Sequence, residues 1–261
     1  EFMKKYFLVM LSTLIVLFLS SCKKVDESPK ELIPQEKQNG LCYMYTSTLN
    51  PACSWGEDQL SRQSRQNGYL FVGIHSPNQK DPMEVPEALF NSFIEDRPNP
   101  KPYYYPLYIV GDKDCSNCTV MFNMDDILSR TCNIAMAARD TIINNKMTVT
   151  IKTKNLTQLE DVDYYMGVYV LEDNLVYPQN SDSGLISNFS HNCVLRKTSS
   201  GNVYYGEKVF TGGDINKVYD KEFTIDVTGC NPKYTYALVV IYKEGVESTP
   251  KYLYENAFWT R

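Results

Sequence analysis

Histidine is scarce in this chain of 261 residues, which contains only His75 and His191. A metal site built from histidines alone is therefore impossible, and we predict no metal and no cofactor. Basic residues are outnumbered as well, since 26 Lys and Arg face 31 Asp and Glu for a formal net charge of −5. Nucleic-acid-binding proteins carry a basic face, so we expect no nucleic-acid partner. Long apolar runs are missing beyond the N-terminal segment, which excludes a polytopic membrane protein.

Tyrosine, by contrast, is abundant, with 20 Tyr beside 11 Phe and 2 Trp. Tyrosine favours strands and half-buried surfaces. A hydrophobic content of 43% and a charged content of 22% are typical of globular proteins. The length suffices for one large domain or two of modest size.

Residues 1–21 have the features of a targeting segment. Lys4 and Lys5 form a basic start, and Tyr6 to Leu19 is an apolar run too short for a membrane-spanning helix. The ending Leu19-Ser20-Ser21-Cys22 resembles the lipobox of bacterial lipoproteins, which implies cleavage before Cys22 and attachment of lipid, including palmitate. We predict a lipoprotein signal peptide over residues 1–21, followed by a lipidated Cys22 and a flexible tether over residues 22–39.

The tether begins with the charged residues Lys23, Lys24, Asp26 and Glu27. These resemble the export signals of surface lipoproteins in Bacteroidota-type bacteria. We expect a protein held at the outer membrane by lipid alone, and both a periplasmic and a cell-surface orientation stay open.

Residues 40–140 alternate between strand and helix patterns. Residues 69–75 form a continuous apolar run, as expected of a strand covered on both faces. The other predicted strands cover residues 41–46, 105–110 and 119–122. Helices are predicted over 53–67, 85–93 and 124–138, the last with Asn123 as its N-cap.

From residue 141 the pattern changes to alternating apolar and polar residues, typical of half-solvated strands. Strands are predicted at 147–153, 164–171, 194–198, 222–227 and 234–242. Turn clusters rich in Ser, Asn and Gly separate them. We therefore predict an antiparallel β-sandwich over residues 141–261.

The first half resembles the thioredoxin fold, in which a Cys-x-x-Cys follows the first strand and a cis-proline faces it. Here Asn50-Pro51-Ala52-Cys53 stands at the first place and Tyr105-Pro106-Leu107 at the second. A carboxamide cannot attack a disulfide, so Asn50 leaves the motif without its nucleophile. The resemblance implies a degenerate thioredoxin-like domain over residues 40–140. Asn50, Cys53 and Pro106 mark its motif, and we assign no catalytic residue.

The second half carries more specific segments: Tyr165-Met166-Gly167-Val168-Tyr169-Val170-Leu171-Glu172-Asp173, His191-Asn192-Cys193-Val194-Leu195-Arg196 and Tyr254-Glu255-Asn256-Ala257-Phe258-Trp259. They resemble the outer-membrane-protein-28-related lipoprotein family. The resemblance implies a thioredoxin-like domain followed by a C-terminal β-sandwich, in an outer-membrane lipoprotein sometimes described as surface-exposed or adhesin-like. It implies no settled biochemical activity.

Seven cysteines follow Cys22: Cys42, Cys53, Cys115, Cys118, Cys132, Cys193 and Cys230. Beyond the inner membrane we expect disulfides, and an odd number leaves at least one thiol unpaired. Candidate bridges join Cys42 to Cys53 and Cys193 to Cys230. Cys115 and Cys118 form a true Cys-x-x-Cys, for which a structural disulfide, a redox pair and a zinc site stay open. Neighbouring Asp112 and Asp114 disfavour a thiolate there.

The three consecutive tyrosines Tyr103, Tyr104 and Tyr105 cannot all be buried on one face. They form a possible contact loop for a protein or glycan partner. His75, His191, Trp55 and Trp259 are expected to pack or cap within the core. We therefore predict a non-enzymatic binding, adhesin-like or assembly role. The alternatives are a thiol-disulfide oxidoreductase using Cys115 and Cys118, or a structural subunit of an envelope complex.

Overall fold

A computed structural model describes residues 31–67, 69–77, 80–96, 104–115, 119–246 and 250–261. The predicted signal peptide and the predicted lipidation site Cys22 lie outside these residues. Leu32–Arg261 forms a single compact unit. Within the described part of the chain, no helix combines the length and apolarity needed to cross a membrane.

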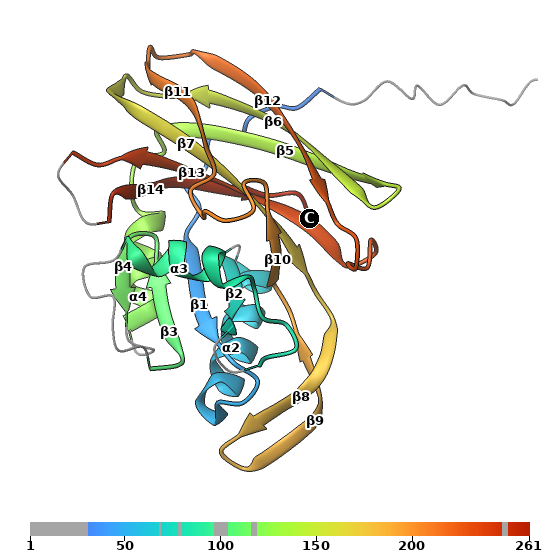
Figure 1. Cartoon of the computed structure of the whole chain (residues 1–261). Helices are drawn as coiled ribbons and strands as arrows, with labels where there is room; N and C mark the ends of the chain where they lie inside the picture. Colours follow the sequence, from blue (N-terminus) through green and yellow to red (C-terminus); the bar gives the residue numbers. More distant parts are fainter. Residues whose placement is uncertain (1–30, 68, 78–79, 97–103, 116–118, 247–249) are drawn as a thin grey trace, which may run out of the picture. The chain divides into compact units, whose positions relative to one another are not determined.

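The protein is mostly β, and its main sheet has nine strands (Figure 1). Eight of them follow the order β14-β13-β7-β10-β2-β1-β3-β4, and β11 pairs with β7. Their bounds are β1 Leu41–Thr46, β2 Leu70–His75, β3 Leu107–Val110, β4 Lys113–Cys115, β7 Leu159–Glu172, β10 Val194–Thr198, β11 Glu207–Gly213, β13 Thr235–Glu244 and β14 Tyr252–Trp259. β1 and β2 run parallel, whereas β3 is antiparallel to β1. The parallel pair therefore ends at one edge, at Thr46 and His75.

Two smaller sheets complete the β structure. The first has the order β12-β6-β5, with bounds β5 Ile134–Ile143, β6 Lys146–Asn155 and β12 Val218–Asp226. The second is the hairpin of β8 Leu175–Ser181 and β9 Gly184–His191. Apolar residues of β5, β6 and β12 form one core with β7 and β13, including Val149, Val168 and Val239. The three-stranded sheet therefore packs against β7 and β13 of the main sheet through this hydrophobic core.

The helices are α2 Pro51–Asn67, α3 Glu87–Glu95 and α4 Val120–Leu128. Leu89, Phe90 and Phe93 of α3 enter the second core, which also contains the fully buried Tyr43, Tyr169 and Tyr242. The Tyr242 hydroxyl bonds to those of Tyr43 and Tyr169, the latter at 2.5 Å. Part of the tyrosine content therefore fills the interior, with the hydroxyl groups satisfying one another.

Several predicted elements are confirmed. β1 and β10 have the predicted bounds, β2 is buried along its whole length, and α2 and α3 lie where the pattern placed them. Three predictions are wrong, including the N-cap at Asn123, which lies inside α4. The helix expected over residues 124–138 ends at Leu128, and residues 134–143 form β5, because pairing along all of β6 overrides the helix propensity of the Ala- and Met-rich run. The strand expected at 119–122 instead begins α4.

The last residues of the predicted tether are fixed to the folded unit. Gln35 exchanges backbone hydrogen bonds with Met136. The Asn39 side chain donates to the carbonyl of Ala257 at 2.8 Å and is buried. At the predicted boundary, residue 141 lies inside β5, and β10 of the second half pairs with β2 of the first. The two halves therefore share one sheet.

Candidate functional site

A buried polar cluster lies where the parallel strands β1 and β2 end. Thr46 and His75 are the last residues of those strands, and Glu57 reaches the same place from α2. His191 closes it from the end of β9, and Asp81 comes from the loop after β2. All five side chains are buried. Polar groups so placed must satisfy one another, because water does not reach them.

The close approach of α2 to the sheet depends on Gly56. A Cβ atom at this position would overlap the Tyr108 hydroxyl and the Met44 side chain. Cys53 and Glu57, one helical turn apart, therefore share the face of α2 that is pressed against the sheet, and both are buried. This packing puts the Glu57 carboxylate under the ends of β1 and β2.

Glu57 is the centre of the cluster. Its Oε2 lies 2.6 Å from Nδ1 of His191, and its Oε1 accepts the Thr46 hydroxyl and lies 3.8 Å from Nε2 of His75. The other ring nitrogen of His75 lies 3.0 Å from Oδ2 of Asp81. Asp81 also accepts the backbone N–H groups of Thr48 at 2.6 Å and Met83 at 2.9 Å. Two carboxylates and two imidazoles thus alternate in one chain of contacts.

These contacts determine the ionisation of the acids. Burial alone would raise the pKa of Glu57, but its hydrogen bond to His191 and the charge of His75 hold it below its usual value. Burial opposes ionisation of Asp81 too, yet the contact with His75 and the two backbone donors lower its pKa to about 2. Both carboxyl groups are therefore anionic at neutral pH.

The predicted thioredoxin motif borders this cluster. Asn50 precedes α2, where its Oδ1 accepts the Ala52 N–H at 3.0 Å and its Nδ2 donates to the Tyr105 carbonyl at 3.1 Å. The Tyr105–Pro106 peptide bond is cis. Cys53 is fully buried, and burial raises its pKa to about 11. The structure thus brings Asn50, Cys53 and Pro106 together, with a neutral thiol as their only sulfur.

The six cysteines that the structure describes are free: Cys42, Cys53, Cys115, Cys132, Cys193 and Cys230. The two bridges expected between them are therefore absent. Cys42 lies in β1 and Cys53 in the first turn of α2, and neither is bonded to the other. Cys193 and Cys230 belong to different hydrophobic cores, so their side chains face apart.

Cys118 lies outside the described residues, so the pairing of Cys115 with it stays a prediction. Cys115 itself is buried at the end of β4, and burial raises its pKa. Its sulfur accepts a hydrogen bond from Asn123 at 3.0 Å.

The predicted contact loop divides into residues of different exposure. Tyr104 is 81% exposed, whereas Tyr105 is half-buried and donates its hydroxyl hydrogen bond to Ser76 at 2.7 Å. Tyr103 lies outside the described residues. Trp55, expected in the core, is 57% exposed on α2 instead.

Exposed apolar side chains lie on the segments that meet near the start of α2, where Asn50 contacts the carbonyl of Tyr105. Asn180 of β8 donates to the carbonyls of Thr48 at 2.8 Å and Leu49 at 2.9 Å, and it pairs with Leu185 of β9. This contact places Leu49 beside the tip of the hairpin, and α2 packs along β8. We call the exposed residues here the apolar rim: Leu49, Trp55, Tyr104, Leu185 and Ile186.

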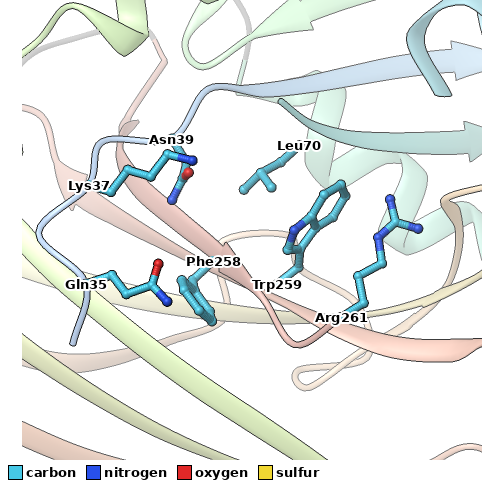
Figure 2. A pocket seen from close by; sticks show the side chains of 7 residues that line it. All are labelled: Gln35, Lys37, Asn39, Leu70, Phe258, Trp259 and Arg261. Atoms are coloured by element: carbon cyan, nitrogen blue, oxygen red, sulfur yellow. The ribbon is translucent and has the colours of Figure 1, made fainter. Parts of the chain in front are cut away.

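A polar pocket of about 180 Å³ lies elsewhere, between residues 35–39, the start of β2 and the end of β14 (Figure 2). The Arg261 guanidinium stacks 3.9 Å from the Trp259 ring beside it and pairs with Asp173 at 2.7 Å. None of its lining residues belongs to the cluster around Glu57. The pocket marks where the N-terminal segment joins the folded unit.

From the sequence, His75 and His191 were each interpreted as an isolated core histidine, so the cluster around Glu57 was not predicted. The two residues belong to elements that the chain order does not connect, and the hairpin carrying His191 was not predicted. Glu57 was not singled out because one acid in a helix has no distinguishing pattern. The helical spacing of Cys53 and Glu57 was the one available indication that this acid faces inward.

Two solved structures share the fold. HBP35 of Porphyromonas gingivalis aligns with a TM-score of 0.66 at 16% identity, over 87% of this chain and 76% of that one. Protein AGR_C_4864 from Agrobacterium tumefaciens aligns with a TM-score of 0.50 at 11% identity, over 86% of this chain and 95% of that one. No curated protein sequence matches the chain. At these identities the likeness is one of fold.

The sequence profile of outer membrane protein Omp28 matches residues 108–251. The fold and this match define an outer-membrane protein. More particularly, since the match covers over half of the chain, the protein belongs to the Omp28 family. The predicted family and outer-membrane location are thereby confirmed.

Proposed function

We propose that this outer-membrane protein is a non-enzymatic binding protein with a degenerate thioredoxin-like domain, anchored by lipid at Cys22. The observation that carries the proposal is the start of α2, where Asn50 replaces a nucleophile and caps the helix. The remaining Cys53 is buried with its pKa raised to about 11, so a thiolate does not form there at neutral pH.

The thioredoxin-like assignment draws support from topology. β1 leads into α2 and then into β2 parallel to β1, while β3 and β4 continue the sheet antiparallel. The half containing β5 to β14 is proposed as the sandwich domain, with both domains sharing the main sheet.

The apolar rim is the proposed contact surface for a protein or glycan partner. Leu49, Trp55, Tyr104 and Leu185 each expose more than half of their surface. Neighbouring exposed apolar groups of this kind are typical of interaction sites, where aromatic side chains supply contact area at low entropic cost. Whether this surface faces the periplasm or the exterior stays an open part of the proposal.

Photo-crosslinking in the intact envelope tests the role. A photoreactive phenylalanine is placed at Tyr104 or Leu185 of the full-length protein. The control position is Ile143 on the β5–β6 hairpin, which is as exposed as Leu185. We expect a discrete, saturable adduct from the rim positions and none from Ile143. Equal adducts at all three positions, or none at the rim, would contradict the proposed surface.

The oxidoreductase and envelope-subunit alternatives remain predictions. The raised pKa of Cys115 disfavours the first, because a thiol-disulfide nucleophile reacts as the thiolate. The variant Cys115→Ser abolishes disulfide reduction if that activity exists. Co-purification after mild detergent extraction tests for a stable envelope complex.

A further inference from the structure

We propose that Glu57, His75 and His191 bind one divalent transition-metal ion of the zinc class. One ligand atom from each of the three residues lies within 4.8 Å of the others, and all three side chains are buried. Two imidazoles and one carboxylate form a ligand set that suits Zn²⁺ and similar ions. This inference goes beyond the proposed binding role and does not depend on it.

Unpartnered ring nitrogens point to a ligand. Both ring nitrogens of His75 and Nε2 of His191 are buried without a hydrogen-bond partner among the described residues, although Nδ1 of His75 lies 3.0 Å from Oδ2 of Asp81. Buried nitrogens in folded proteins are normally satisfied, so these atoms call for an explanation. A metal ion between the three side chains would use the free lone pairs that the protein leaves there.

Asp81 prepares His75 for this role. Its Oδ2 lies 3.0 Å from Nδ1 of His75, so Nε2 is the ring nitrogen left to bind a metal ion. That Nε2 lies 3.8 Å from Oε1 of Glu57, a separation at which one cation can contact both atoms. A carboxylate that orients a metal-binding histidine through its other nitrogen is a recurrent feature of metal sites.

The buried acids also favour a cation. Glu57 and Asp81 bring two carboxyl groups into the interior of the protein. Within the described residues, their ion-pair partners are the two histidines, and neither lysine nor arginine takes part. A divalent cation held by Glu57, His75 and His191 would supply the positive charge that lysine and arginine do not.

The test uses the full-length protein in detergent, stripped with a chelator and then titrated with Zn²⁺ and with Co²⁺. Metal analysis gives the stoichiometry, and the Co²⁺ spectrum shows the ligand type. We expect one ion per chain and a Co²⁺ spectrum without thiolate charge-transfer bands, since the ligands are nitrogen and oxygen. The wild-type melting temperature rises with Zn²⁺ and stays unchanged with Mg²⁺.

Variants assign the site. Glu57→Gln and His191→Asn are expected to remove binding, and Asp81→Asn to weaken it about 10–100-fold through the orientation of His75. Asp58→Asn, the neighbouring acid paired with Arg62 on the outer side of α2, is the matched control and binds like the wild type. The metal titration of the wild-type protein tests the proposal even if a variant fails to fold. Absence of stoichiometric binding there overturns the proposal, as does binding retained in folded Glu57→Gln or thiolate bands that assign the metal to cysteines.

Discussion

Oε2 of Glu57 lies 2.6 Å from Nδ1 of His191 inside the protein, although 134 residues separate them in the chain. The contact joins helix α2 to the end of the β8–β9 hairpin, with both side chains almost free of solvent. Removal of either side chain would leave the other one buried without its hydrogen-bond partner. Such losses cost more than a surface ion pair of the same length.

The first prediction concerns the loss of stability at low pH, which we expect Asp81 to dominate. Contacts with His75 lower the folded-state pKa of Asp81 from 3.8 to about 2. A depressed pKa stabilises the folded state above the unfolded pKa, and this contribution is lost as the pH falls from about 4 to about 2. The shift corresponds to roughly 2 kcal/mol. We expect Asp81→Asn to lower the free energy of unfolding at pH 7 by at least that amount.

Urea unfolding between pH 2 and pH 7, with chelator present, measures this difference. The difference in the free energy of unfolding between the wild type and Asp81→Asn should shrink as the pH falls. Asp58→Asn, which removes only a surface ion pair with Arg62, should change stability by less than about 1 kcal/mol at any pH. A gap that stays constant with pH would show that the carboxylate of Asp81 acts through packing alone.

Eight of the fourteen strands in the described residues were predicted, because their patterns are local, whereas β4, β5, β8, β9, β11 and β14 were not. Residues 70–75 form an unbroken apolar run, and this pattern already implies a strand covered on both faces. The error at residues 134–143 has a tertiary cause, since Ala135, Met136 and Ala137 favour a helix in isolation. The turn residues Asn144 and Asn145 both have positive φ, a hairpin feature that the prediction did not use.

The cluster around Glu57 was less predictable than the strands, because it is assembled by tertiary contacts that local sequence patterns do not report. His75 and His191 each resemble an ordinary core histidine in the sequence, and only the folded hairpin brings their ring centroids to 5.4 Å. Asn50, Cys53 and Pro106 were easier to connect, because they lie at the start of α2 and just before β3, two elements that local patterns predict.

Cys53 should be unreactive in the folded protein. With a pKa of about 11, roughly one thiol in a thousand is ionised at pH 8, and burial blocks access as well. We expect iodoacetamide to modify Cys53 only after unfolding, as measured by peptide mass spectrometry over time. The urea-unfolded protein is the control for intrinsic reactivity. Rapid native labelling would contradict both the burial and the raised pKa.

Gly56 should resist a substitution that usually helps helices. Replacing glycine by alanine within a helix ordinarily stabilises it by about 1 kcal/mol. At Gly56 the added methyl group would overlap Tyr108 and Met44, so Gly56→Ala is expected to destabilise the protein by about 1–3 kcal/mol. Thermal unfolding gives the sign. Gln59→Ala in the same helix controls for propensity, and equal stability of the two variants would refute the close approach.

The two adjacent tyrosines Tyr104 and Tyr105 should respond differently to loss of the hydroxyl group. Tyr105→Phe removes a 2.7 Å hydrogen bond to Ser76 and should cost about 0.5–1.5 kcal/mol. Tyr104→Phe changes an exposed side chain and should stay within about 0.5 kcal/mol of the wild type. Chemical denaturation measures both, and a larger loss for Tyr104→Phe would mean that its ring is packed rather than exposed.

Asn50→Cys should supply the redox chemistry that the proposed thioredoxin-like motif lacks. The new thiol would stand at the N-terminus of α2, where the helix dipole and unpaired N–H groups stabilise a thiolate. Cys53, three residues later, is positioned as the resolving thiol. We expect the variant to form a disulfide between position 50 and Cys53 and to reduce insulin disulfides at a rate clearly above that of the wild type.

Loss of the Asn50 side chain has effects of its own, so a second variant is needed to isolate the thiol. Asn50→Ser keeps an oxygen that accepts the Ala52 N–H and therefore retains the cap without a nucleophile. It should fold like the wild type and remain inactive. The double variant Asn50→Cys/Cys53→Ser should trap a mixed disulfide, because no resolving thiol is left. If Asn50→Cys folds but neither forms the disulfide nor gains reductase activity, then the start of α2 is not a degenerate redox site, and the missing nucleophile cannot explain the absence of that chemistry.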